Sequence, residues 1–107
     1  MEITTEELKQ KIKNGDKLIV DFHAKWCSPC KVMKPAFEKL AEEYRKENSE
    51  VQLYTMDVEI NQEFASSLGV RAVPTVKSFS EGKEVYSQPG MQMESQIKEL
   101  VDNLLNG

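Results

Sequence analysis

The chain has 107 residues, the length of a single domain, and its shares of hydrophobic (39%) and charged (30%) residues are typical of globular proteins. The formal net charge of -4 argues against a nucleic-acid-binding protein, which usually carries a basic face, and no basic amphipathic segment indicates a membrane-surface protein. The N-terminus has no basic start followed by an apolar run, so we expect no secretory signal. These features predict one domain over residues 1–107, monomeric and cytoplasmic, with no nucleic-acid or membrane partner.

The first half of the chain predicts a helix, a strand and a second helix. Thr4 and Glu7 have the spacing of a capping box, which predicts a helix that ends near Gly15. The short apolar run over residues 18–22 is typical of a strand buried on both faces. A helical repeat of apolar residues follows the two cysteines, and Pro35 inside this repeat predicts a kink.

The second half predicts a strand over residues 51–58, a short helix over 62–68 and a last helix whose apolar stripe lies over 97–105. Between the last two, residues 76–79 and 83–86 flank a Glu-Gly pair, which is the pattern of a tight hairpin.

Strands and helices alternate early in the chain, and a hairpin comes late. This order predicts an α/β fold with a central mixed sheet of about five strands, flanked by four helices. In this count residues 1–3 supply a short edge strand.

The only two cysteines, Cys27 and Cys30, lie in the segment Trp26-Cys27-Ser28-Pro29-Cys30, where the buried strand gives way to a helix. The N-terminus of a helix has free N–H groups and a dipole that stabilise a thiolate, the species that attacks disulfides. Cys27 precedes the first turn, so we expect it to be the more exposed thiol and the attacking nucleophile. Cys30 lies within that turn, so we expect it to be more buried and to act as the resolving thiol.

The cysteine pair has three other interpretations. A structural disulfide would close a very short loop and so would stabilise the chain little. A zinc site would need about four nitrogen or sulfur ligands, and His23 is the only other soft ligand. Two ordinary buried thiols would not require the tryptophan and proline beside them.

With these residues in place, the sequence resembles the thioredoxin family. Cysteines at this spacing are a weak signal alone, but here an aspartate precedes them and a Val-Pro-Thr segment follows. The resemblance implies the thioredoxin fold and a redox-active disulfide between Cys27 and Cys30, with no bound cofactor and no metal. The matching segments, best between Lys17 and Gly90, are Val20-Asp21-Phe22, Ala24, Trp26 to Lys31, Pro35, Gly69 to Thr75, Phe79, Gly82 and Gly90.

The resemblance also implies roles for two further residues. Asp21 matches the buried acid of the family, and burial on an apolar strand should raise its pKa so that it exchanges a proton with Cys30 near neutral pH. An inert, hydrogen-bonded aspartate at a strand end is the alternative. Pro74 matches the cis-proline that faces the disulfide and turns the backbone at Val73 toward an extended substrate, whereas a plain trans proline in a turn is the alternative.

A shallow docking surface for protein substrates is implied around Cys27, because exposed apolar surface of this kind marks interaction sites. Loop packing is an equally good interpretation of Met91. The expected members of this surface are Trp26, Ser28, Pro29, Val73, Gly90 and Met91.

The sequence departs from the family pattern at four positions. His23 stands where many members have a second tryptophan, and it is either a packing residue or a charge that perturbs the Cys27 region near its ordinary pKa. Ser28 replaces the commoner glycine, which affects the redox potential in a direction that the sequence does not reveal. Thr55 replaces a lysine of many bacterial members, which should leave Asp21 harder to ionise. Met93 stands where a serine-type N-cap is expected, so the last helix should fray at its start.

The implied function is a general protein disulfide reductase that acts on disulfide-containing proteins and is recharged by an NADPH-dependent thioredoxin reductase. A disulfide oxidase or isomerase would share the fold, and the equilibrium with glutathione would separate them. Glutaredoxin is a weaker match, because its motif usually carries a tyrosine after the proline. A binding module with incidental cysteines is the remaining alternative, and the full set of Cys27, Cys30, Asp21 and Pro74 argues against it.

Overall fold

Four strands form one mixed sheet in the order β2-β1-β3-β4. Strands β1 (Lys17–His23) and β2 (Val51–Asp57) are parallel, whereas β3 (Thr75–Ser80) is antiparallel to both β1 and β4 (Lys83–Pro89). The central strand β1 is buried from its second residue to its last, as its near-continuous apolar sequence predicts.

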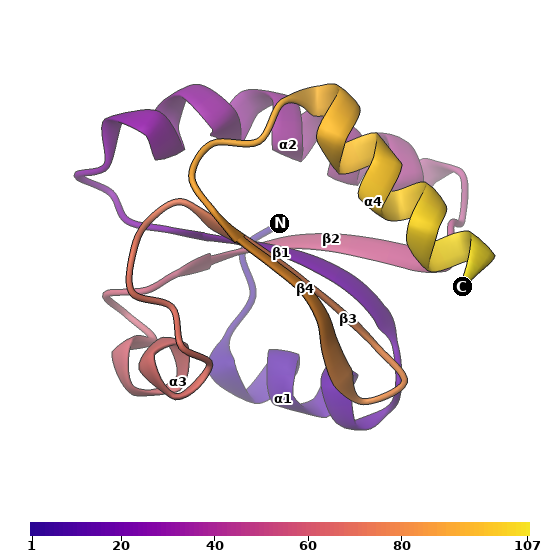
Figure 1. Cartoon of the computed structure of the whole chain (residues 1–107), viewed down its shortest axis with the longest axis horizontal. Coiled ribbons are helices and arrows are strands. Elements are labelled where there is room, and N and C mark those ends of the chain that lie inside the picture. Colours follow the sequence, from indigo (N-terminus) through magenta and orange to yellow (C-terminus); the bar gives the residue numbers. More distant parts are fainter.

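Four helices cover the two faces of the sheet in the computed structural model, which describes residues 1–107 (Figure 1). Helices α2 (Ser28–Lys46) and α4 (Glu94–Asn106) lie on one face, and α1 (Thr5–Lys13) and α3 (Gln62–Ser67) lie on the other. None of the helices is both long and apolar enough to cross a membrane.

The sequence prediction counted about five strands, and the structure has four. Residues 1–3 contribute only an isolated parallel bridge between Glu2 and Thr55, with the Ile3 N–H donating to the Thr55 carbonyl at 2.8 Å. The cap of α1 explains the difference. Thr4 is already the N-cap of that helix, so the chain turns away from β2 before a ladder can extend.

Two hydrophobic cores form because side chains alternate along β1. Ile19 belongs to the core under α2 and α4, and Leu18, Val20 and Phe22 belong to the core over α1 and α3. The alternation therefore places Asp21 and His23 on the face of Ile19, toward α2.

The predicted signals at the ends of elements are present. The Glu7 N–H donates to the Thr4 hydroxyl at 3.2 Å, which closes the capping box of α1. Glu81 and Gly82, at φ values of 55° and 82°, turn the hairpin between β3 and β4. Pro35 lies inside α2, and the kink expected there stays a prediction.

The start of α4 is held in place despite its weak N-cap residue. Met93 is the N-cap, and its backbone N–H donates to Oε1 of Gln96 at 2.7 Å. The glutamine at the third helical position therefore supplies a hydrogen bond that the expectation of fraying did not include.

Candidate active site

The two cysteines are joined as a disulfide at the N-terminus of α2, and their Cα atoms lie 5.3 Å apart. Cys27 is the N-cap of the helix, and Pro29 lies in its first turn. The backbone N–H of Cys30 donates to Sγ of Cys27 at 3.2 Å. A free N–H group and the positive end of the helix are thus directed at one sulfur, the arrangement that stabilises a thiolate.

The expected difference in exposure between the two cysteines is wrong for this structure. Cys27 and Cys30 are each 3% exposed. They form a small apolar cluster with Ala24, against which Val58 and Val73 pack. Exposure therefore does not distinguish the two sulfurs. The helix cap does, because Cys27 and not Cys30 is the N-cap residue of α2.

Asp21 lies in the interior, on the α2-facing side of β1. It is fully buried, and neither carboxylate oxygen has a hydrogen-bond partner. Burial raises its pKa from 3.8 to about 7, in the direction expected from its apolar strand. Thr55 is its partner in the register of β2, but the Thr55 hydroxyl donates to Glu2 at 2.5 Å instead.

Pro74 follows a cis peptide bond after Val73, as the sequence resemblance implies. It is buried, and its carbonyl accepts a hydrogen bond from the Gly90 N–H at 2.8 Å. This bond fastens the loop after β4 to the loop before β3. Val73, half-buried against the cysteines, is thereby held at the site together with the exposed Gly90.

The remaining members of the expected docking surface are exposed. Trp26 is 66% exposed and Met91 is 52% exposed, and Ser28 and Pro29 are also exposed at the start of α2. Trp26, Ser28 and Pro29 adjoin the cysteines in sequence, and Met91 follows Gly90. The exposed Trp26 is the largest apolar side chain available to a partner beside the disulfide.

A polar cluster beside Asp21 was not predicted from the sequence. Nε2 of His23 lies 2.8 Å from Oε1 of Glu2, and the Asp57 N–H donates to Oε2 of Glu2 at 2.6 Å. The sequence singled out His23 but gave no signal for Glu2. Glu2 and His23 are 21 positions apart, and only the bridge between Glu2 and Thr55 brings them together.

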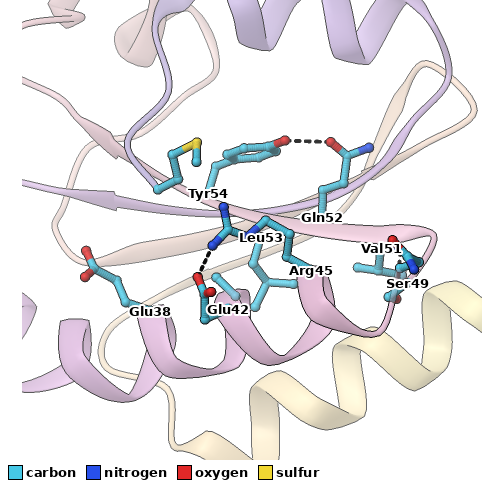
Figure 2. Close-up of a pocket in the computed structure, with 11 residues that line it drawn as sticks. Glu38, Glu42, Arg45, Ser49, Val51, Gln52, Leu53 and Tyr54 are labelled. Atoms are coloured by element: carbon cyan, nitrogen blue, oxygen red, sulfur yellow. Dashed lines mark hydrogen bonds and ion pairs between the residues drawn. The ribbon is translucent and has the colours of Figure 1, made fainter.

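Two cavities lie near α2, and one of them reaches the cysteines. A cavity of about 420 Å³ is lined by Cys30, His23 and Glu2, together with Ala24, Lys25, Lys31, Lys34, Asp57 and Ile60. A larger cavity of about 640 Å³ lies between α2 and β2 and contains no cysteine or histidine. Figure 2 shows two polar pairs in this cavity: Arg45 is turned to Glu42, and the Tyr54 hydroxyl donates to Gln52 at 2.6 Å.

No group of three or more histidine, cysteine, aspartate or glutamate side chains is arranged to hold a metal ion. The sulfurs form a reversible dithiol–disulfide pair at a helix N-terminus, and a carboxyl group of raised pKa lies buried on the α2-facing side of β1.

Comparisons with known proteins agree with this chemistry. The Thioredoxin family model matches residues 1–103. Thioredoxin from Homo sapiens is 42% identical over 91 residues, covering 81% of this chain and 83% of the human protein. Thioredoxin from Mycoplasmoides gallisepticum is 36% identical over 95 residues, covering 89% of this chain and 91% of that protein.

Solved structures show the same fold. Fasciola hepatica thioredoxin superposes with a TM-score of 0.82 at 34% identity, over 96% of this chain and 98% of that one. The oxidized form of mitochondrial thioredoxin 3 from Saccharomyces cerevisiae gives 0.77 at 30% identity, over 92% and 88%. The chain belongs to the thioredoxin family, and its Cys27–Cys30 pair performs thiol–disulfide exchange as a protein disulfide reductase.

Proposed function

We propose that Cys27 attacks the disulfide of a protein substrate and that Cys30 resolves the mixed disulfide that results. The observation that carries this assignment is the helix cap: the Cys30 N–H donates to Sγ of Cys27 at 3.2 Å. After reduction, the same N–H favours the anionic form of the Cys27 sulfur, and the thiolate is the nucleophile in disulfide exchange.

The reaction proceeds in two exchanges. In the first, the Cys27 thiolate bonds to one substrate sulfur, and the other substrate sulfur leaves as a thiolate. In the second, Cys30 loses its proton and attacks Sγ of Cys27. The bond between Cys27 and the substrate breaks, the substrate leaves fully reduced, and the Cys27–Cys30 disulfide remains.

Asp21 is the proposed acceptor of the Cys30 proton in the second exchange, and the proton donor in the reverse direction. Its burial and its pKa of about 7 support this role, because a general base is most effective when its pKa lies near the working pH. Its two unpartnered oxygens support it further, since no competing hydrogen bond fixes the carboxylate.

Protein substrates are proposed to dock over the exposed Trp26 and the neighbouring surface. Val73 supports this placement, because it packs against the cysteines and precedes β3, which begins at Thr75. Its backbone groups lie outside the sheet ladder, where an extended segment of substrate can pair with them. Ser28, Pro29, Gly90 and Met91 complete this proposed surface, and Pro74 is proposed to hold its shape.

The electron donor is proposed to be an NADPH-dependent thioredoxin reductase. The protein itself is proposed to be a cytoplasmic monomer that carries no bound cofactor. The redox-active disulfide needs a two-electron donor after each turnover, and a flavin reductase supplies a pair of electrons. In a reducing compartment a cysteine pair of this spacing serves catalysis rather than structure.

Trapping the mixed disulfide tests the order of attack. A Cys30→Ser variant should accumulate a covalent complex with disulfide-containing substrates such as insulin, because no second thiol remains to resolve it. Non-reducing electrophoresis should show this adduct, and dithiothreitol should release it. The matched Cys27→Ser variant should form little adduct, and a stronger adduct through Cys30 would overturn the assignment.

A coupled assay tests the proposed donor. Oxidation of NADPH by a thioredoxin reductase should become dependent on both this protein and insulin. If dithiothreitol drives insulin reduction but no thioredoxin reductase does, the proposed donor is wrong while the disulfide reductase activity stands.

A further inference from the structure

A strip of polar residues runs along one side of β1 and β2, from the buried Asp21 to the protein surface. Asp21 and His23 lie on the α2-facing side of β1, and their register partners on β2 are Thr55 and Asp57. Val51 and Leu53 of β2 belong to the core under α2, so the alternation of β2 places Thr55 and Asp57 on this same side.

Glu2 closes the outer end of this strip. Its Oε1 lies 2.8 Å from Nε2 of His23 and accepts from the Thr55 hydroxyl at 2.5 Å, while its Oε2 accepts from the Asp57 N–H. The His23 side chain is 10% exposed and that of Glu2 is 46% exposed. The pair therefore spans the distance from the interior to water.

The cavity of about 420 Å³ lies along this pair. Glu2, His23 and Asp57 line it together with Cys30. Water that enters the cavity meets the imidazole of His23, whereas Asp21 itself is fully buried and does not line it.

Other charges face the same region from α2. Lys34 lines the cavity and pairs with Glu38 at 3.8 Å, and both side chains are about half exposed. Lys31 lines the cavity near Cys30, and Lys25 lines it from the loop after β1. Of the groups that line the cavity, His23 is the one on the same strand as Asp21, and an imidazole can take up and release a proton near neutral pH.

We infer that His23, held by Glu2, is the group through which Asp21 exchanges its proton with solvent. The inference rests on the proposed role of Asp21. In this arrangement His23 and Glu2 are positioning residues, since neither touches the substrate sulfurs.

In this scheme the Cys30 proton reaches water through Asp21 and His23. Cys30 gives its thiol proton to the Asp21 carboxylate and attacks Sγ of Cys27, so that the Cys27–Cys30 bond forms and the substrate leaves as a thiolate. Asp21 then passes the proton to neutral His23. The imidazolium releases it to water at the exposed side of Glu2, and Asp21 is a carboxylate again for the next turnover.

The pKa directions are compatible with this transfer. The hydrogen bond to Glu2 raises the pKa of His23 and outweighs the opposing effect of burial. Burial opposes ionisation of Glu2, but the hydrogen bonds from His23, Thr55 and the Asp57 N–H leave the pKa of Glu2 below its ordinary value. An anionic Glu2 thus favours a proton on His23, and Asp21, with a pKa of about 7, can release one near neutral pH.

Single-turnover kinetics with Ellman's reagent isolate the relevant step. Attack by Cys27 releases one coloured thiolate, and attack by Cys30 on the mixed disulfide releases the second. We expect His23→Ala to slow the second phase about tenfold at about pH 7, where Asp21 is partly protonated and must first lose its proton, and to affect it less at about pH 9. Glu6→Gln, which removes an exposed carboxylate away from the cavity, should leave both phases unchanged.

Chemical rescue separates proton transfer from a structural role of His23. Free imidazole should restore the second phase of His23→Ala, whereas pyrazole, a ring of the same size that is far less basic, should not. Equal effects of the two rings, or a second phase unchanged by His23→Ala, would overturn the inference. If His23→Ala does not fold, Glu2→Gln retains the imidazole but removes the carboxylate that holds it, and it should still slow the second phase at about pH 7. No slowing would overturn the inference.

The Asp21→Asn variant distinguishes the two levels of the proposal. If Asp21→Asn does not slow the second phase, the proposed role of Asp21 fails, and the inference fails with it. If Asp21→Asn slows the phase and His23→Ala does not, only the route through His23 fails. In the double variant the loss of His23 should add nothing to the loss of Asp21, because the two act in series.

Discussion

The carboxyl of Asp21 lies in the interior with no hydrogen-bond partner, an arrangement that selection for stability alone would not favour. The resemblance to the thioredoxin family implied that Asp21 is buried, and its apolar strand then predicted a raised pKa. Glu2, by contrast, could not be predicted, because its contact with His23 depends on the bridge to Thr55 rather than on any local pattern.

We predict that Asp21→Asn increases the stability of the protein, and that this increase is larger at alkaline pH than at acid pH. Between the unfolded pKa of 3.8 and the folded pKa of about 7, the folded state holds a proton that the unfolded state lacks. Stability therefore falls as the pH rises through this window, by about 1.4 kcal/mol per pKa unit, or on the order of 4 kcal/mol in total.

Denaturant unfolding at about pH 4 and about pH 8 measures this effect. The difference in free energy of unfolding between Asp21→Asn and the unsubstituted protein should grow by roughly 4 kcal/mol from the acid to the alkaline condition. The exposed Asp102→Asn should show no such growth. A gain that is equal at both pH values would show that Asp21 is ionised in the folded protein throughout.

The hairpin of β3 and β4 was predicted from two short apolar runs on either side of a turn. The Glu-Gly turn located the hairpin, but nothing local indicated that Lys77 would be buried. Its side chain is 4% exposed, and its Nζ lies 2.7 Å from Glu84 and 3.0 Å from the Ser87 hydroxyl. Both partners come from β4, so the burial of this lysine follows from strand pairing and not from its own sequence neighbours.

Removing the carboxylate of Glu84 should destabilise this hairpin. We predict a loss of about 1–3 kcal/mol for Glu84→Ala, since the buried ammonium loses its charged partner; the partial exposure of Glu84 keeps the loss below that of a fully buried pair. Lys77→Met should cost less, and adding it to Glu84→Ala should recover part of the loss. Thermal unfolding measures these differences against the exposed Glu99→Ala, and equal melting temperatures for the two glutamate variants would contradict the prediction.

For the whole molecule, the alternation of strands and helices was sufficient to predict the α/β class and a sheet with helices on both faces. It did not predict the order or the number of the strands. The order β2-β1-β3-β4 depends on pairing between distant segments. The prediction of a fifth strand was wrong, because the chain enters the capping box of α1 at Thr4 and leaves too few residues before it to form a strand. Strand β1 joins the two cores, with Ile19 in one and Val20 in the other.

A strand shared by both cores should make unfolding cooperative. We predict that Phe37→Ala, which empties part of the core under α2, lowers stability by about 3–5 kcal/mol while leaving a single transition. The fluorescence of Trp26, the only tryptophan, and far-UV circular dichroism should report the same midpoint. Val32→Ala, at a side chain that is 68% exposed on the same helix, should change stability by less than about 0.5 kcal/mol. Separate midpoints for the two signals would show that the cores unfold independently.

The cavity beside Cys30 shares none of its lining residues with the surface around Trp26, Val73 and Met91 where substrates are proposed to bind. A client protein resting on that surface therefore need not seal the cavity. Water can keep reaching the cavity beside Cys30 while the client is still covalently attached to Cys27, so Asp21 can lose its proton at the mixed-disulfide stage, before Cys30 attacks.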